Sequence, residues 1–390
     1  MRRSTLTLSV LGLAFAPAAW SIPVSLADST VKLDVGAVMQ NRAEMNWAED
    51  SKGNAFDVNR GKLGESDPVD FYNRRARLTV SAEREGWKGL ISFAADNADK
   101  TGKKERAVDL VYLWAAKTIK TGSLSHVITV GQDQPNVQPA YRDPSSQLLL
   151  PVPRATVLFP SAYIGYGARY QLNHKQFQFS VDVQNNRDQG KVDSTETDGL
   201  FYGARLVASP IPGLALPKRT ESFAGEPGMG LAIGIDGTMD HSHVLKESNG
   251  SIVTASYLSG GADILFHMDN LTAVADARIQ KFYRPENKVL SYAVSVQAGY
   301  AIPVAAAGIV LEPALRGSII DKDVDVDEAV KTYSSSAVAE HGNSGYEGEV
   351  GLNIYFKGHS NKVQIGFQRW EAEASDASAN ILRVQHQFSF

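Results

Sequence analysis

The chain has 390 residues, 33 glycines, no cysteine and a formal net charge of -4. Its length would suit two or three soluble domains, yet no linker, low-complexity tract or composition shift marks a boundary. The lack of cysteine excludes disulfides and thiolate metal sites. The mean hydropathy of -0.20 is too polar for a bundle of membrane-spanning helices, but it suits a barrel in which every second strand residue faces lipid.

The first residues have the pattern of a secretory signal peptide. Two arginines follow Met1, and an apolar stretch runs from Leu6 to Ala19. Small residues that permit cleavage follow in Ala19-Trp20-Ser21 and in Ser25-Leu26-Ala27. We therefore predict a signal peptide over residues 1–27, cleaved after residue 21 or 27, and a single domain over residues 28–390. The alternative, a lone membrane anchor, is disfavoured because the apolar stretch is shorter than about 20 residues.

Alternation of apolar and polar residues then predicts a series of strands. Residues 30–39 show it cleanly, with apolar residues at odd positions and mostly polar ones at even positions. Strand side chains point alternately to opposite faces, so each such stretch has one apolar face. The predicted strands cover residues 30–39, 72–82, 87–95, 107–116, 126–132, 162–172, 176–184, 200–208, 228–239, 254–266, 271–281, 289–301, 309–320, 350–356, 363–367 and 380–390.

The connections between these strands alternate between short and long. Short periplasmic turns and long external loops are typical of outer-membrane barrels, and a last strand that pairs with the first removes both sheet edges. Ser209–Pro227 is the exception, because it is long in a short-turn position. We predict an all-β, antiparallel transmembrane β-barrel of about 16 strands. A soluble exported β-sandwich is the alternative, but it requires no such parity of loops.

The connection Asp133–Pro160 differs from the others. It contains six prolines and the apolar run Leu148-Leu149-Leu150. Proline removes backbone donors, so the segment should not extend the sheet. A loop of this length with an apolar middle is expected to pack against another part of the protein, which inside a barrel is the wall. We predict a long third loop that folds inward and narrows the lumen.

Several motifs resemble the phosphate-selective porin O and P family. Residues 351–365 are similar to that family's penultimate hairpin, with a Gly-Leu-Asn-x-Tyr strand, an x-Gly-His turn and a Lys-x-Gln strand. Phe71–Leu78 resembles its Phe-x-x-Arg-Arg-Ala-Arg-Leu stretch, and Val130-Gly131-Gln132 resembles the start of its inward loop. The resemblance implies a sixteen-stranded, trimeric barrel that passes small anions. Residues 133–160 hold only two arginines as basic residues, so we expect passage of anions rather than phosphate specificity.

The chemistry of a pore lies in the charges that line it. Rings of Arg and Lys favour anions, and rings of Asp and Glu favour cations. The alternative for each residue is an ordinary lumen charge that pairs across strands. For the two loop arginines, pinning of the loop by carboxylates and contact with passing ions are both open. The candidates for anion selectivity are Arg75, Arg77, Lys88, Arg278 and Arg316 on strands, and Arg142 and Arg154 in the inward loop.

Aromatic residues are expected on the lipid face, in girdles at the two membrane interfaces. A slide of aromatic rings for carbohydrates along the lumen is the alternative. The residues concerned are Trp87, Tyr112, Trp114, Tyr292, Tyr300, Phe388 and Phe390.

The sequence predicts no cofactor, no metal centre and no enzymatic activity. The acidic run Asp321–Glu328 fails the calcium-loop pattern because Val326 stands where glycine is needed. The closest histidines, His241 and His243, have no catalytic partners at recognisable spacing.

We therefore predict a porin of the bacterial outer membrane, a passive channel for small hydrophilic solutes that favours anions. Its expected partners are small anions or other small solutes, outer-membrane lipid, lipopolysaccharide and further copies of itself in a homotrimer, with no nucleic acid. A structural or adhesive barrel, working through its external loops without transport, is the alternative.

Overall fold

The structure is a computed structural model of the chain. It describes residues 22–25, 31–49, 55–57, 62–63, 69–96, 108–137, 147–152, 154, 164–185, 199–217, 221–246, 252–283, 288–321, 344–372 and 378–390. Within these ranges, no helix is both long and apolar enough to cross a membrane.

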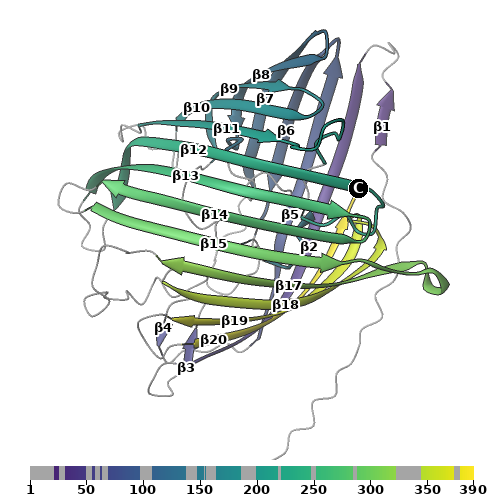
Figure 1. Cartoon of the computed structure of the whole chain (residues 1–390), viewed down its shortest axis with the longest axis vertical. Helices are drawn as coiled ribbons and strands as arrows, with labels where there is room; N and C mark the ends of the chain where they lie inside the picture. Colours follow the sequence, from purple (N-terminus) through teal and green to yellow (C-terminus); the bar gives the residue numbers. More distant parts are fainter. Residues whose placement is uncertain are drawn as a thin grey trace, which may run out of the picture.

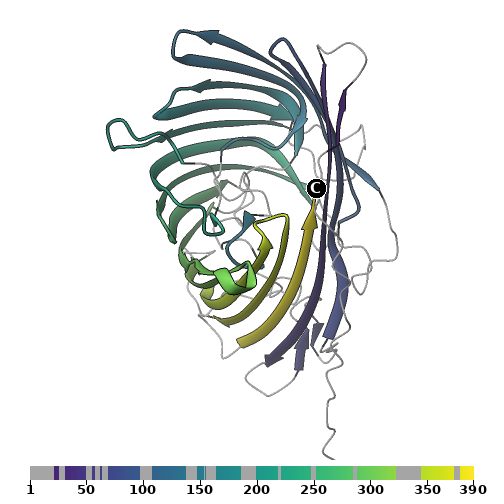
Figure 2. The same cartoon turned by 90° about the vertical axis from the view of Figure 1, so that its right-hand side faces the viewer.

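The described residues form a closed antiparallel barrel of 16 strands (Figure 1), as predicted. The first barrel strand, β2 (Lys32–Glu49), pairs with the last, β20 (Ser378–Ser389), and these strands lie side by side in the turned view (Figure 2). This pairing closes the sheet, so the β-sandwich alternative is wrong. The other strands are β5 (Val69–Arg84), β6 (Trp87–Ala94), β7 (Asp109–Thr121), β8 (Leu124–Asp133), β9 (Gly165–Asn173), β10 (Phe177–Asn185), β11 (Leu200–Ala208), β12 (Met229–Lys246), β13 (Ile252–Met268), β14 (Leu271–Tyr283), β15 (Lys288–Tyr300), β17 (Ile309–Asp321), β18 (Gly345–Lys357) and β19 (Asn361–Ala372).

Smaller elements extend the barrel at its ends. β1 (Ile22–Ser25) pairs with the start of β2 and lies between the two predicted cleavage positions. β3 (Ala55–Asp57) and β4 (Lys62–Leu63) form a short ladder beside the other end of β2. β16 (Ile302–Val304) and the 3₁₀ helix η3 (Ala305–Ala307) precede β17. None of these was predicted, because each is too short to show a period.

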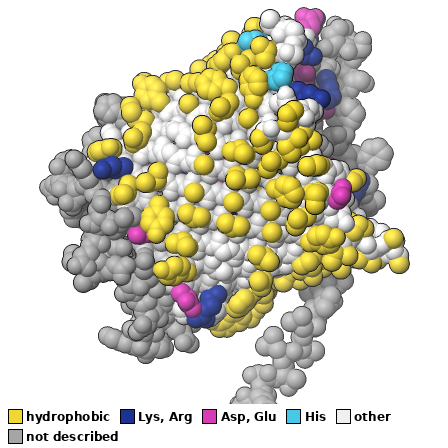
Figure 3. Space-filling model, viewed as in Figure 1, with side chains coloured by type: hydrophobic (Ala, Val, Ile, Leu, Met, Phe, Trp, Pro, Cys, Tyr) yellow, Lys and Arg dark blue, Asp and Glu magenta, His cyan; other side chains and the backbone are white. Residues whose placement is uncertain are grey.

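The two faces of the wall differ in polarity. On β15, Val294 and Val296 point outward and are exposed, while Ser295 and Gln297 point into the barrel and are buried. Much of the barrel repeats this alternation, and the face seen in Figure 3 carries many apolar side chains and few charges. An apolar outside and a polar inside are the surfaces that a transmembrane barrel requires.

The predicted aromatic girdle holds only in part. Trp87, Tyr300 and Phe390 are exposed on the outer face. Tyr112 and Trp114 were predicted to point outward, and this was wrong. Leu113 between them is the exposed, outward residue, and the Tyr112 hydroxyl donates to Gln134 of the third loop at 3.4 Å. Apolar residues occupy both faces of β7, so its alternation could not reveal which face is outside.

The connections give the barrel two unlike ends. At one end, which we call the short-turn end, tight turns join the strands. In the turn Glu85-Gly86, for example, both residues have positive φ, which matches the twist of a β-hairpin. The third loop belongs to the opposite, long-loop end. The 209–227 connection between β11 and β12 lies at the short-turn end, although it is long.

Candidate functional site in the barrel lumen

The first described part of the third loop lies against β9–β11 inside the barrel. The backbone N–H of Asn136 donates to Asp182 at 3.1 Å, and its side-chain amide donates to Gln171 at 3.0 Å. Val137 is buried against Phe201. A lumen-facing carboxylate and amide therefore accept the backbone and side-chain N–H groups of Asn136, where the loop enters the barrel.

The second part, which we call the 147–154 segment (residues 147–152 and 154), crosses to β17–β19. Lys362 and Gln364 both donate to the carbonyl oxygen of Leu148 at 3.1 Å, and Asn353 donates to that of Leu149 at 2.8 Å. The polar lumen wall thus supplies donors to the backbone, as buried carbonyl groups require. The described residues of the third loop fold inward, as predicted.

The leucines of this segment fit where the wall carries glycine. A Cβ atom at Gly299 would approach Leu149 Cδ1 to 2.6 Å, and one at Gly351 would approach Leu150 Cδ2 to 2.6 Å. Both leucines are fully buried, and they pack with Ala314. Small wall residues therefore make room for the apolar side chains that the sequence placed in the middle of the loop.

Arg154 ends the segment in a buried ion-pair cluster. Its guanidinium donates to Asp276 of β14 at 3.0 Å and also to Glu221 of the 209–227 connection. The side chains of Arg154 and Glu221 are completely shielded from solvent. Arg154 was expected either to pin the loop or to contact passing ions, and its buried contacts with two carboxylates are those of a residue that pins the loop.

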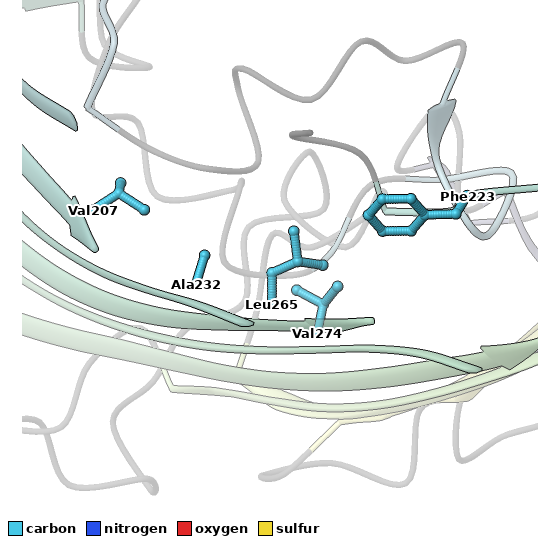
Figure 4. Close-up of a cluster of buried hydrophobic side chains, with 5 residues drawn as sticks. All are labelled: Val207, Phe223, Ala232, Leu265 and Val274. Atoms are coloured by element: carbon cyan, nitrogen blue, oxygen red, sulfur yellow. The ribbon is translucent and has the colours of Figure 1, made fainter. Parts of the chain in front are cut away.

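Residues 221–223 of the 209–227 connection also lie against the inner wall. Phe223 packs with the lumen-facing residues Val207, Ala232, Leu265 and Val274, and Figure 4 shows it coming from a separate segment while the other four belong to barrel strands. Its ring stacks on that of His267, with the centroids 3.6 Å apart. The connection therefore occupies lumen space at the short-turn end.

Most of the described lumen arginines are buried beside carboxylates of other strands. Arg316 donates to Glu347 at 2.8 Å and to Glu349, and also to the carbonyl oxygen of Val152 at 2.8 Å. Arg278 donates to Asp236 and to Ser259. Arginine presents several donors in a rigid fork, so one residue can join two strands and the loop.

The arginines of β5 have a different environment. Arg75 and Arg77 share one carboxylate, that of Asp96, at 3.7 and 2.5 Å. Their side chains are 21% and 20% exposed, and that of Asp96 is 25% exposed. Two guanidinium groups beside one carboxylate leave a net positive charge that faces water. Among the described ion pairs of the lumen, this is the one in which two partly exposed arginines share a single carboxylate.

A β-bulge adds a third arginine to this cluster. Gln40 lies opposite Arg75 and Asn41 opposite Asn73, so Arg74 is the extra residue of the bulge. Arg74 donates to the buried Gln40 side chain at 2.9 Å, which places it on the lumen side. Assigning alternate residues to opposite faces missed Arg74. A bulge puts two consecutive residues on one face, and no sequence pattern here indicates it.

The remaining candidates lie elsewhere. Lys88 is exposed near the start of β6 at the short-turn end, in register with Glu83. Arg142 lies outside the described residues. Glu221, which the sequence did not single out, accepts from Gln297 of the wall and from Arg154 of the third loop, and no local pattern in residues 209–227 marks it.

Many solved structures share this fold, and three of them are outer-membrane proteins with the following similarity. An anion-selective porin from Comamonas acidovorans has a TM-score of 0.56 at 11% sequence identity, covering 92% of this chain and 99% of that chain. OmpF of Salmonella typhi, in complex with daunomycin, has a TM-score of 0.54 at 13% identity, covering 93% and 99%. The trimer form of OmpT, an outer membrane protein of Vibrio cholerae, has a TM-score of 0.53 at 11% identity, covering 92% and 99%.

No family model matches the chain, and no curated protein matches it in sequence. The likeness to solved structures therefore establishes the barrel fold. The resemblance to phosphate-selective porins O and P stays a hypothesis.

Proposed function

We propose that this chain is a porin of the bacterial outer membrane, a passive diffusion channel for small hydrophilic solutes that favours anions. The observation that carries the proposal is the water-exposed arginine cluster of β5, inside a closed barrel with an apolar outside. Positive charge along a pore lowers the cost for an anion to leave bulk water. The anion-selective porin among the solved structures of this fold agrees with this assignment.

In this proposal, the ion path follows β5 and avoids the walls that the inserted segments cover. On β15, β18 and β19, the lumen-facing side chains Gln297, Asn353 and Gln364 are almost completely buried, and each donates to an inserted segment. On β5, by contrast, the side chains of Arg75 and Arg77 remain partly exposed. Ions that cross the barrel thus pass the arginines of β5 and are screened from those of β14 and β17.

Further parts of the proposal concern the surroundings of the barrel. The apolar outer face contacts outer-membrane lipid, with lipopolysaccharide around the long-loop end. A homotrimer is expected, and the OmpT neighbour is described as a trimer form. Phosphate is one of the small anions that the channel would pass, but no feature of the described lumen singles it out. The barrel catalyses no reaction in this proposal.

Reconstitution into a planar lipid bilayer tests the channel itself. We expect stepwise current increases of uniform size in KCl solution, each from one inserted unit. Long polyethylene glycols that are too large to enter the lumen should leave the size of these current steps unaltered. A folded, inserted protein that gives no steps would contradict the proposal and favour the structural or adhesive barrel.

A further inference from the structure

The 209–227 connection is far longer than joining two neighbouring strands requires. Two residues, Gly122 and Ser123, suffice between β7 and β8 at the same end of the barrel. Its early part stays near that end, where the backbone N–H of Leu216 donates to the carbonyl oxygen of Lys175 at 2.9 Å. Pro217 then lies against Gly230 at the start of β12.

The later part of the connection crosses the inner wall toward β18. Phe223 packs on β12–β14, and the hydroxyl of the neighbouring Ser222 donates to Glu312 of β17 at 2.8 Å. The same hydroxyl lies 2.7 Å from that of Tyr355 on β18, and His359 bonds the carbonyl oxygen of Ser222 at 2.8 Å. A segment that begins at β11 is thus held as far round the barrel as the β18–β19 turn.

Glu221 joins this connection to the third loop. One carboxylate oxygen accepts from Arg154; the other accepts from the backbone N–H of Leu149 at 3.3 Å and from Gln297 of β15 at 2.8 Å. Arg154 is in turn bonded to Asp276. Segments that enter from opposite ends of the barrel therefore meet at one buried carboxylate, which is fully shielded from solvent.

We propose that residues 221–226 of the 209–227 connection form an internal plug that, with the 147–154 segment, closes the β12–β19 side of the lumen. Glu221 is its positioning residue: by accepting from Arg154 and from Leu149, it holds both segments against the wall. The proposal rests on the proposed function only in taking the barrel to be a channel. This role accounts for the length of the connection, because residues 221–226 occupy part of the lumen and are not needed to join β11 to β12.

Channel recordings on three variants test the plug. In the first, residues 210–226 are replaced by a two-residue turn, which leaves every barrel strand intact. The second is Glu221→Gln, which keeps the size of the side chain and removes its charge. The control is Glu226→Gln, the same change at an exposed position of the same connection. Heat-dependent migration in detergent gels identifies the folded barrels.

The shortened variant should show a unit conductance about twofold above that of the unaltered protein, in proportion to the lumen that it uncovers. It should also admit longer polyethylene glycols. Glu221→Gln should add a second, larger conductance level as the two segments separate. Glu226→Gln should match the unaltered protein in both readouts.

An unchanged unit conductance and polymer size limit in the shortened variant would overturn the plug. A single unaltered conductance level in Glu221→Gln would overturn the positioning role of Glu221. Both results are distinct from failure of the proposed function, in which the unaltered protein itself gives no channels.

Discussion

Single residues decide which charges a passing ion meets. Arg278 is buried beside Asp236, two strands away, and Arg316 is buried beside Glu347 and Glu349 of the adjacent strand, so their charge is neutralised where they lie. Arg75 and Arg77 share Asp96 and remain partly exposed. Because screening by salt limits charge effects to about 10 Å at 0.1 M, only the second pair should act on ions in the open part of the lumen.

Replacing Arg75 and Arg77 by glutamine should shift the channel toward cations. An ion about 4 Å from one charge in water gains about 1 kcal/mol, which is about a fivefold effect on the permeability ratio for each charge removed. The reversal potential across a KCl gradient measures this ratio. Arg84→Gln, at the exposed end of the same strand, is the control and should have no effect; equal ratios in both variants would refute the role of the pair.

Replacing Arg316 by methionine should lower stability and leave ion selectivity unchanged. Glu347 and Glu349 would be left buried without their cation, and breaking a buried pair from one side costs about 3–5 kcal/mol. The temperature at which the barrel loses its fast gel migration should fall. A large change in reversal potential with unaltered stability would contradict the structural role.

At this scale, sequence parity predicted the face of most residues and failed at two places for local reasons. Arg74 joins the lumen through a bulge, and a bulge shifts the parity of a strand without changing its composition. Tyr112 points inward because β7 carries apolar residues on both faces. In each case the deciding contact comes from a residue distant in sequence.

The inward loop is the element on which the shape of the lumen depends. Its apolar run and its prolines predicted that it leaves the sheet and packs inside, and the described residues confirm this. The wall positions that receive it could not be predicted, because Gly299 and Gly351 look like ordinary strand glycines until Leu149 and Leu150 lie over them. The course of the 209–227 connection could not be predicted for the same reason, because its partners are spread over strands from β11 to β18.

Gly299→Ala should displace Leu149 and loosen the inward loop. The added methyl group would stand 2.6 Å from Leu149 Cδ1, and such overpacking costs about 1–3 kcal/mol. We expect a lower unfolding temperature and noisier channel currents. Gly317→Ala on β17, where an added Cβ meets no atom within 4 Å, is the matched control. Identical behaviour of the two variants would show that Leu149 is not held by close packing.

The strand β1 bears on the place of signal cleavage. Ile22–Ser25 pairs with Lys32–Val35 of β2, so cleavage after Ser21 keeps this pairing and cleavage after Ala27 removes it. We predict that the mature chain begins at Ile22. Mass spectrometry of the exported protein measures the N-terminus directly, and a start at Asp28 would contradict the prediction.

The whole molecule combines a predictable barrel with an interior that long-range contacts determine. The strand count, the closure and the alternation of short and long connections all follow from periodic patterns, which survive because lipid and water face opposite sides of every strand. Strand ends were less accurate: β2 continues to Glu49, beyond the predicted residue 39. Polar residues on both faces, such as Asn41 and Arg42, hide the alternation there.

The central claim, an anion-favouring channel whose open path follows β5, is tested most directly by the reversal potential of the unaltered protein in a planar bilayer. With a tenfold KCl gradient, we predict a reversal potential with the sign of the chloride equilibrium potential, because the net positive cluster of Arg75, Arg77 and Asp96 faces the open lumen. A potential of the sign set by potassium would contradict it.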